Sequence, residues 1–137
     1  MRDREPGPRP RRSRFVPPAA GVLLLPLGTF VLAGWFTGHP ETARLAPQFP
    51  LPRPNSAACF ALLGAGLILL STRVWRVACA LGAVVTIAAG MSLVQYLAQV
   101  DVGIDRILRP LLPVVEPGWA GMAPNSAVGI SLGGIAL

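Results

Sequence analysis

The sequence predicts an all-α fold: an integral membrane helical bundle with three full transmembrane helices, a truncated fourth, and two parallel helix-loop-helix repeats. Three observations predict it. The 137-residue chain is 53% hydrophobic and only 13% charged, against about 25% charged in a typical soluble domain. Its charges cluster between long uncharged runs, and a four-residue motif recurs 70 residues further along the chain. This composition excludes a disordered tail and an ordinary soluble enzyme.

The charged clusters divide the chain into three parts. Residues 1–14 are a basic tail, residues 15–76 a first transmembrane repeat unit, and residues 77–137 a second unit that is incomplete at its C-terminus. The uncharged apolar runs inside the two units are residues 15–36, 56–72, 77–100 and 123–137. About 20 apolar residues span a bilayer, so the first three runs predict full transmembrane helices and the last predicts a helix that has only begun. We therefore expect this chain to be either a piece of a longer polypeptide or a truncated reading frame.

The first apolar run has an alternative interpretation as a signal peptide. It follows a basic segment and ends near a weak small-residue site at residues 31–33. Trp35 and Phe36 suit a membrane interface, and further apolar runs follow. These features favour an uncleaved transmembrane helix.

The arginines predict that the N-terminus lies in the cytoplasm. The expected topology determinants are Arg11, Arg12 and Arg14 of the tail, with Arg73 and Arg76 between the second and third helices. This orientation puts eight arginines inside and four outside, and all of the net charge of +6 falls inside, in agreement with the positive-inside rule. We expect a multi-pass membrane protein whose N-terminal tail meets anionic lipid headgroups on the cytoplasmic side. Nucleic acid is not an expected partner, because no aromatic residues interleave with the arginines.

The repeated motif stands at the start of the second helix of each unit. Its residues are Pro54, Asn55 and Ser56 in the first copy and Pro124, Asn125 and Ser126 in the second, each followed by alanine. Proline disfavours a helical conformation in the residue before it, and an Asn or Ser side chain can accept a hydrogen bond from a first-turn N–H. We expect the motif to cap both helices, with Asn as a favoured N-cap and Ser able to take the same role. The alternative is that these polar side chains line a ligand site at the outer surface.

The outer loop after the third helix carries the charged residues Asp101, Asp105 and Arg109. Apolar residues at helical spacing predict a short amphipathic helix over residues 102–112 that lies on the membrane. Asp105 and Arg109 are four residues apart and would pair on that helix. Two carboxylates four residues apart can also form an acid/base or cation site, but a solvated face is favoured.

Nothing in the sequence predicts catalysis, a metal or a cofactor: it has no Walker loop, no nucleophile with a base and no metal-ligand cluster. No ionisable residue stands in the middle of an apolar run, which counts against ion-coupled transport. Cys59 and Cys79 would differ in depth by roughly 16 Å at the helical rise. A disulfide needs Cα atoms within about 7 Å, so we expect two free thiols.

Two sequence patterns resemble the membrane-embedded N-terminal input region of bacterial sensor histidine kinases, which also occurs on diguanylate cyclases. The first is a proline seven residues before the proline of the Pro-Asn-Ser-Ala motif, at residues 47–57 and 117–127. The second is the segment 93–97 followed by 101–108, which is similar to the acidic Gly-Ile-Asp loop of those regions. The resemblance covers residues 34–137.

The resemblance implies a membrane sensor or input module of the two-component type, non-catalytic on this chain. It also implies a homodimer in the lipid bilayer of the bacterial cytoplasmic (inner) membrane and a missing cytoplasmic output domain of the PAS or kinase type. No kinase residue can be carried over. The alternative function is a small stand-alone multi-pass membrane protein or a transporter subunit.

Overall fold

The computed structural model describes residues 16–44, 48, 51–72, 74–104, 107–113 and 122–137. These residues form four α-helices and no strand, which confirms the prediction of an all-α fold. The helices are α1 (Val16–Phe36), α2 (Pro54–Leu70), α3 (Trp75–Ala98) and α4 (Pro124–Ile135). The described parts of the connections include the short 3₁₀-helices η1 (Pro40–Ala43) and η3 (Arg109–Leu111).

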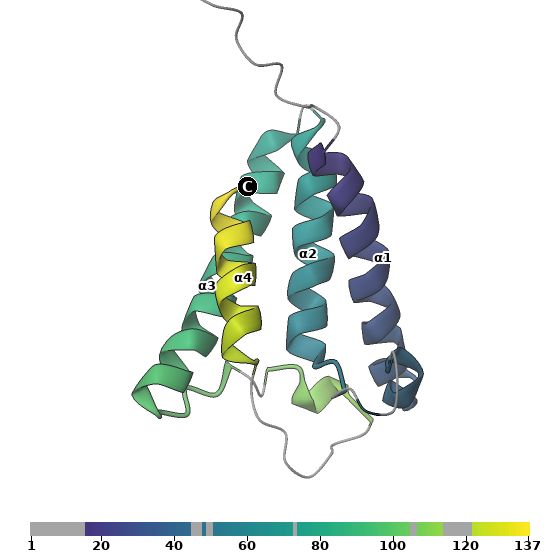
Figure 1. Ribbon diagram of the computed structural model, residues 1–137, viewed down its shortest axis with the longest axis vertical. Helices are drawn as coiled ribbons and strands as arrows, with labels where there is room; N and C mark the ends of the chain where they lie inside the picture. The colour runs from purple at the N-terminus through teal and green to yellow at the C-terminus, as the bar shows by residue number, and fades with distance from the viewer. Residues whose placement is uncertain (1–15, 45–47, 49–50, 73, 105–106, 114–121) are drawn as a thin grey trace, which may run out of the picture.

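The four helices form two hairpins that stand side by side (Figure 1). In one hairpin α1 packs along α2, and in the other α3 packs along α4. Both motif-bearing helices begin at the end of the bundle that also holds η1 and η3, called here the loop end. The opposite end, called the turn end, holds the short connection between α2 and α3 and the last residue of the chain (Figure 1).

Two of the helices are long and apolar enough to cross a membrane: α1, over Pro18–Phe36, and α3, over Trp75–Ala98. A core helix of a soluble protein or a signal sequence near the N-terminus would meet the same criteria of length and composition. The prediction of three full spans is wrong at the second run, because α2 has 17 residues and extends only roughly 26 Å at the helical rise, short of the roughly 30 Å hydrocarbon core.

The early end of α2 has a local cause in the two hydroxyl residues that follow it. The Ser71 hydroxyl donates to the Ile68 carbonyl at 2.7 Å, and the Thr72 hydroxyl donates to the Leu69 carbonyl at 2.7 Å. Side chains that bond to nearby carbonyls in this way compete with continuation of the helix. The turn is therefore closed by residues that the hydropathy pattern had assigned to the span.

Helices α1 and α2 pack backbone against backbone. A Cβ placed on Gly28 would lie 2.5 Å from the Ala61 nitrogen and 2.6 Å from the Ala57 oxygen, and one on Gly64 would lie 2.5 Å from the Leu25 nitrogen. No side chain fits at either glycine. Small residues at a helix contact permit this close approach in lipid, where packing drives association.

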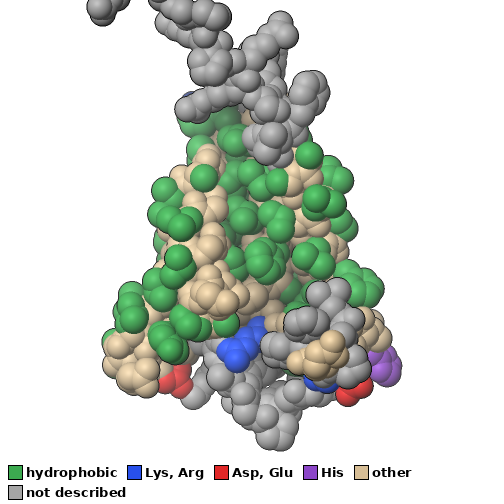
Figure 2. All heavy atoms as spheres, viewed as in Figure 1, with side chains coloured by type: hydrophobic (Ala, Val, Ile, Leu, Met, Phe, Trp, Pro, Cys, Tyr) green, Lys and Arg blue, Asp and Glu red, His purple; other side chains and the backbone are tan. Residues whose placement is uncertain are grey.

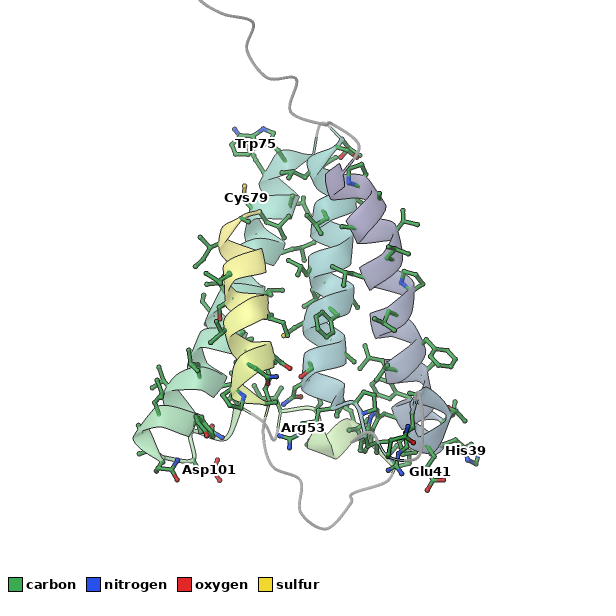
Figure 3. All side chains as sticks on the ribbon, viewed as in Figure 1. His39, Glu41, Arg53, Trp75, Cys79 and Asp101 are labelled. Carbon is green, nitrogen blue, oxygen red and sulfur yellow. The ribbon has the colours of Figure 1, made fainter. Side chains whose placement is uncertain are left out.

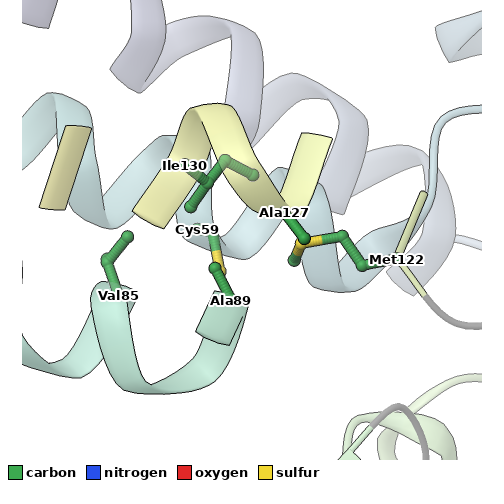
Figure 4. Close-up of a cluster of buried hydrophobic side chains, with 6 residues drawn as sticks. All are labelled: Cys59, Val85, Ala89, Met122, Ala127 and Ile130. Carbon is green, nitrogen blue, oxygen red and sulfur yellow. The ribbon is translucent and has the colours of Figure 1, made fainter. Parts of the chain in front are cut away.

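The second hairpin is joined to the first through a cluster of buried side chains from α2, α3, α4 and the residue two before α4 (Figure 4). Its members are Cys59, Val85, Ala89, Met122, Ala127 and Ile130. Helices α3 and α4 also approach closely where a Cβ on Gly82 would lie 2.6 Å from the Gly134 oxygen.

A second buried cluster, at the loop end, consists of Val31, Trp35, Ala43, Ala57 and Leu112. The Trp35 indole N–H donates to the Pro52 carbonyl at 2.9 Å, so the chain directly before α2 is tied to the end of α1. This bond fixes the backbone next to Arg53, the residue on which the candidate site is centred.

Candidate functional site

Both motif-bearing helices begin at the motif proline, but the capping residue is not the one expected. The N-cap positions are taken by Arg53 and Ala123, which have extended backbones with ψ of 141° and 139°. Their carbonyls accept the first helical hydrogen bonds, at 3.0 Å from the Ala57 N–H and at 2.9 Å from the Ala127 N–H. Pro54 and Pro124 follow them inside the first turn.

The expectation that asparagine is the N-cap is therefore wrong. Proline has a fixed φ and no N–H, which suits the first helical position, and this places Asn55 and Asn125 one residue further inside. In the second copy Asn125 still serves a first-turn donor, because its side-chain oxygen accepts from the Ser126 N–H at 2.9 Å. The motif starts both helices as predicted, through proline rather than through the asparagine.

Two cavities lie at the loop end and share part of their lining. The cavity called here the polar cavity has a volume of about 410 Å³ and lies between the end of α3 and the starts of α2 and α4. The second, called the apolar cavity, has a volume of about 380 Å³ and lies among α1, α2 and the start of α4. The two residues that line both cavities are the N-cap residues Arg53 and Ala123.

Six polar or charged side chains line the polar cavity: Arg53, Ser92, Gln95, Tyr96, Gln99 and Asp101. Several of them are held by local hydrogen bonds. The Gln95 side-chain oxygen accepts from the Val102 N–H at 3.1 Å, and the Gln99 side-chain nitrogen donates to the Tyr96 carbonyl at 2.7 Å. Gln99 ends α3 in the left-handed conformation, with φ of 54°. The wall contributed by α3 is therefore fixed by hydrogen bonds within the chain.

Among the residues that the structure describes, Arg53 is the one basic residue in the lining of these two cavities. It is half-buried and lies at the loop end beside the start of α2 (Figure 3). Among the described residues no hydrogen bond or ion pair to its guanidinium is found. Asp101 lines the same cavity at the end of α3, where its side-chain oxygen accepts from the Gly103 N–H at 2.9 Å. Arg53 is therefore a half-buried cation that forms no ion pair with any residue that the structure describes.

The apolar cavity brings the two copies of the motif together. Its walls are mostly hydrophobic, with Leu27, Phe30, Val31, Leu51 and Phe60 among them. Ser56 from the first copy and Ser126 from the second also line it, and Pro124 lines the polar cavity. Neither lining includes Asn55 or Asn125. Of the ligand-facing residues offered by the sequence, the serines and one proline thus meet a cavity.

The outer loop differs from the predicted amphipathic helix. In the described part of residues 102–112, the chain forms turns and the three-residue helix η3, so the prediction of a continuous α-helix is wrong. Gly103 has a φ of 80°, which lies outside the helical region, and Pro110 lacks the N–H that a continuing helix needs.

Several predicted residues lie away from the cavities or outside the described residues. Arg76 is at the turn end, and its guanidinium carbon lies 5.8 Å from the centroid of the Trp75 ring. The residues whose placement is not described are Arg11, Arg12, Arg14, Arg73 and Asp105, and the same holds for the side chain of Arg109. The predicted pairing of Asp105 with Arg109 therefore stays a prediction.

The expectation of two free thiols is confirmed. Cys59 is buried and Cys79 is exposed, and neither forms a disulfide. The Cys79 sulfur lies 3.6 Å from the Leu137 oxygen near the turn end, whereas Cys59 belongs to the core cluster shared by three helices.

Sequence reasoning missed Arg53 as a site residue. A signal was present, because a cation stands where N-caps are ordinarily Ser, Thr, Asp or Asn, and the second copy has alanine at the matching position. No protein-family model, no curated protein and no solved structure matches this chain. The chemistry of the site therefore rests on its own side chains: a guanidinium that has no partner among the described residues and that lines both a polar and an apolar cavity.

Proposed function

We propose that this chain is a membrane-embedded sensor or input module of a bacterial signal-transduction protein, of the two-component histidine kinase type. In this proposal the helices form a bundle in the cytoplasmic membrane, the turn end faces the cytoplasm, and the loop end receives the stimulus. A change at the loop end would alter the packing of the two hairpins and pass through α4 to an output domain.

The observation that carries the membrane setting is the apolar surface of the helices. In both candidate spans only 28% of the apolar window is buried, whereas a core helix of a soluble protein is mostly buried. Large side chains face outward along the spans, such as Leu23, 73% exposed, and Ile87, 62% exposed. Apolar area of this extent is favourable in lipid and unfavourable in water.

The distribution of charge supports the same setting. The four helices contain one charged residue, Arg76, in the first turn of α3. Figure 2 shows hydrophobic side chains over the helices on the face in view, with the coloured acidic and basic side chains at the ends and mostly at the loop end. Trp75 is exposed next to Arg76 at the turn end, and such aromatic and basic residues are typical of a membrane interface.

The sensing role is supported by the convergence of both repeat units on the cavities at one end. Cavities lined by helices from two packed hairpins are sites where a ligand can favour one packing arrangement over another. The alternative is a stand-alone membrane protein or transporter subunit. It is disfavoured because ion-coupled transport uses charged side chains within the spans, and the middle of each described helix has none.

Two experiments test this proposal. Reporter enzymes fused after Arg76 should report the cytoplasm and those fused near Arg109 the periplasm; the reverse pattern would overturn the orientation. The gene downstream of Leu137 decides the role. A continuous frame that enters a PAS, kinase or cyclase domain supports an input module, and a stop codon directly after Leu137 overturns it.

A further inference from the structure

We infer that the two cavities form one binding site for a single-chain anionic amphiphile. Its anionic headgroup would lie against Arg53 in the polar cavity, and its apolar chain would lie in the apolar cavity among α1, α2 and α4. The inference deepens the proposed function by naming the class of stimulus, and it rests on that proposal for its membrane setting.

The charge of the headgroup follows from Arg53. A half-buried guanidinium loses part of its hydration, and this loss is offset only by a partner of opposite charge or by hydrogen bonds. Among the described residues it has neither, and the Asp101 carboxylate lies at the end of α3 with a bond to the Gly103 N–H. A guanidinium presents a planar fork of donors that fits a carboxylate or phosphate group.

The position of Arg53 strengthens this preference. Arg53 and Ala123 are the N-caps of α2 and α4, so the ends of two helices that carry partial positive charge meet the shared lining of the cavities. An arginine at an N-cap places a full positive charge on a helix end that is already positive. A bound anion removes this repulsion, whereas a cationic ligand would add to it.

The apolar chain follows from the second cavity. Its volume of about 380 Å³ lies within the usual range of roughly 300–1,000 Å³ for ligand pockets. Leu27, Phe30 and Phe60 contribute hydrophobic walls, where each methylene group of a chain gains by leaving water. Since Arg53 lines both cavities, a ligand that spans them places its charge beside the guanidinium and its chain between the helices.

The test uses the protein in nanodiscs of phosphatidylcholine and a dodecanoate probe with a diazirine near the chain terminus. After photolysis, peptide mass spectrometry should place the label on the buried and half-buried walls of the apolar cavity, at Val31, Ala57 or Phe60. The matched dodecanol probe lacks the anion and should label these walls at least tenfold less. Label spread over outward-facing side chains such as Leu23 and Ile87, or equal labelling by acid and alcohol, would overturn the inference.

Variants test each half of the site. Arg53→Gln should reduce cavity labelling at least tenfold, whereas Arg44→Gln, which changes an exposed arginine at the same end, should leave it unchanged. Ser56→Leu should also reduce labelling, because it fills the apolar cavity while Arg53 stays in place. Circular dichroism of each variant shows whether its helices are intact. Unchanged labelling in folded Arg53→Gln would refute the role of the guanidinium.

A further arm separates a free amphiphile from a bilayer lipid. Unlabelled dodecanoate should displace the probe, and phosphatidylglycerol, a two-chain anionic lipid, should not. Displacement by phosphatidylglycerol would overturn the single-chain assignment. The reporter fusions described above test the proposed function separately from this inference. A reversed topology together with labelling that depends on Arg53 would refute only the proposed function. The expected topology without labelling that depends on Arg53 would refute only this inference.

Discussion

The contact between α1 and α2 can be tested at a single atom. In Gly28→Ala the new Cβ would lie 2.5 Å from the Ala61 nitrogen and 2.6 Å from the Ala57 oxygen, where ordinary contact begins at 3.4 Å. Both obstructing atoms belong to the backbone, so no side-chain rotation relieves the clash and the helices must separate by roughly 1 Å in a close-packed interior. Gly129 in α4 is the matched control, because a Cβ there meets nothing within 4 Å.

The expected difference can be estimated from known costs. Overpacking of a well-packed contact costs about 1–3 kcal/mol, and replacing glycine by alanine within a helix gains up to about 1 kcal/mol. Gly28→Ala should therefore lower the free energy of unfolding by about 1 kcal/mol. Gly129→Ala should leave the free energy of unfolding unchanged or raise it by up to about 1 kcal/mol.

The assay is equilibrium unfolding in mixed micelles with increasing denaturing detergent, followed by circular dichroism and tryptophan fluorescence. The comparison between the two variants matters more than either value alone, because both make the same chemical change. Equal stability of Gly28→Ala and Gly129→Ala would refute the backbone contact between α1 and α2.

Three further predictions concern the core, the thiols and the N-cap. Ile130 is 2% exposed in the cluster of Figure 4, and Ile130→Ala should lower the free energy of unfolding by about 2–5 kcal/mol. The control Ile135→Ala, at a side chain that is 70% exposed, should change the free energy of unfolding by about 0.5 kcal/mol or less. Equal losses of stability in the two variants would contradict the placement of Ile130 in the core. Cys79 should react with N-ethylmaleimide in mild detergent well before Cys59, by mass spectrometry, and the reverse order would contradict their burial. Arg53→Asn should raise the unfolding free energy by about 0.5–1 kcal/mol, because asparagine is a better N-cap and a cation leaves the positive helix end; a clear loss of stability would show that Arg53 supports the fold.

The positions of the helices could be predicted from the sequence because charge and proline mark their ends. The uncharged runs at residues 15–36, 77–100 and 123–137 correspond to α1, α3 and α4 within a few residues. For the run at residues 56–72, the predicted end of the helix was wrong, because α2 ends at Leu70. A hydropathy pattern contains no information on the hydrogen bonds that the Ser71 and Thr72 hydroxyls donate to carbonyls of the helix.

The caps and the outer loop show where local patterns mislead. The asparagines of the motif are good capping residues, but the proline before each of them already occupies the first helical position, and capping passes to Arg53 and Ala123. In the outer loop, the prediction of a helix relied on the helical spacing of the apolar residues and did not take account of Gly103. The positive φ of Gly103 lies outside the helical region.

The candidate site could not be predicted from local sequence patterns, because its residues come together only in the tertiary structure. The repeat predicted that Ser56 and Ser126 lie at the same end of the bundle, which left open whether they share a cavity; they do, because α4 starts beside α2. The importance of Arg53 was not visible locally, since an arginine in a loop is ordinarily solvated. Its significance arises from the side chains that surround it and from the absence of a partner among the described residues.

The glycine contact between α1 and α2 also affects how much side-chain conformational entropy is lost when the two helices pack. Glycine and alanine lose no rotamer freedom when they are buried, so the seam at Gly28 and Ala57 orders two helices without freezing any side chain. On the same two helices, the walls of the apolar cavity are built from Leu27, Phe30 and Phe60, whose side chains have rotamers to exchange. The hairpin thus combines a closely packed seam of small residues with a cavity lining whose side chains keep rotamer freedom.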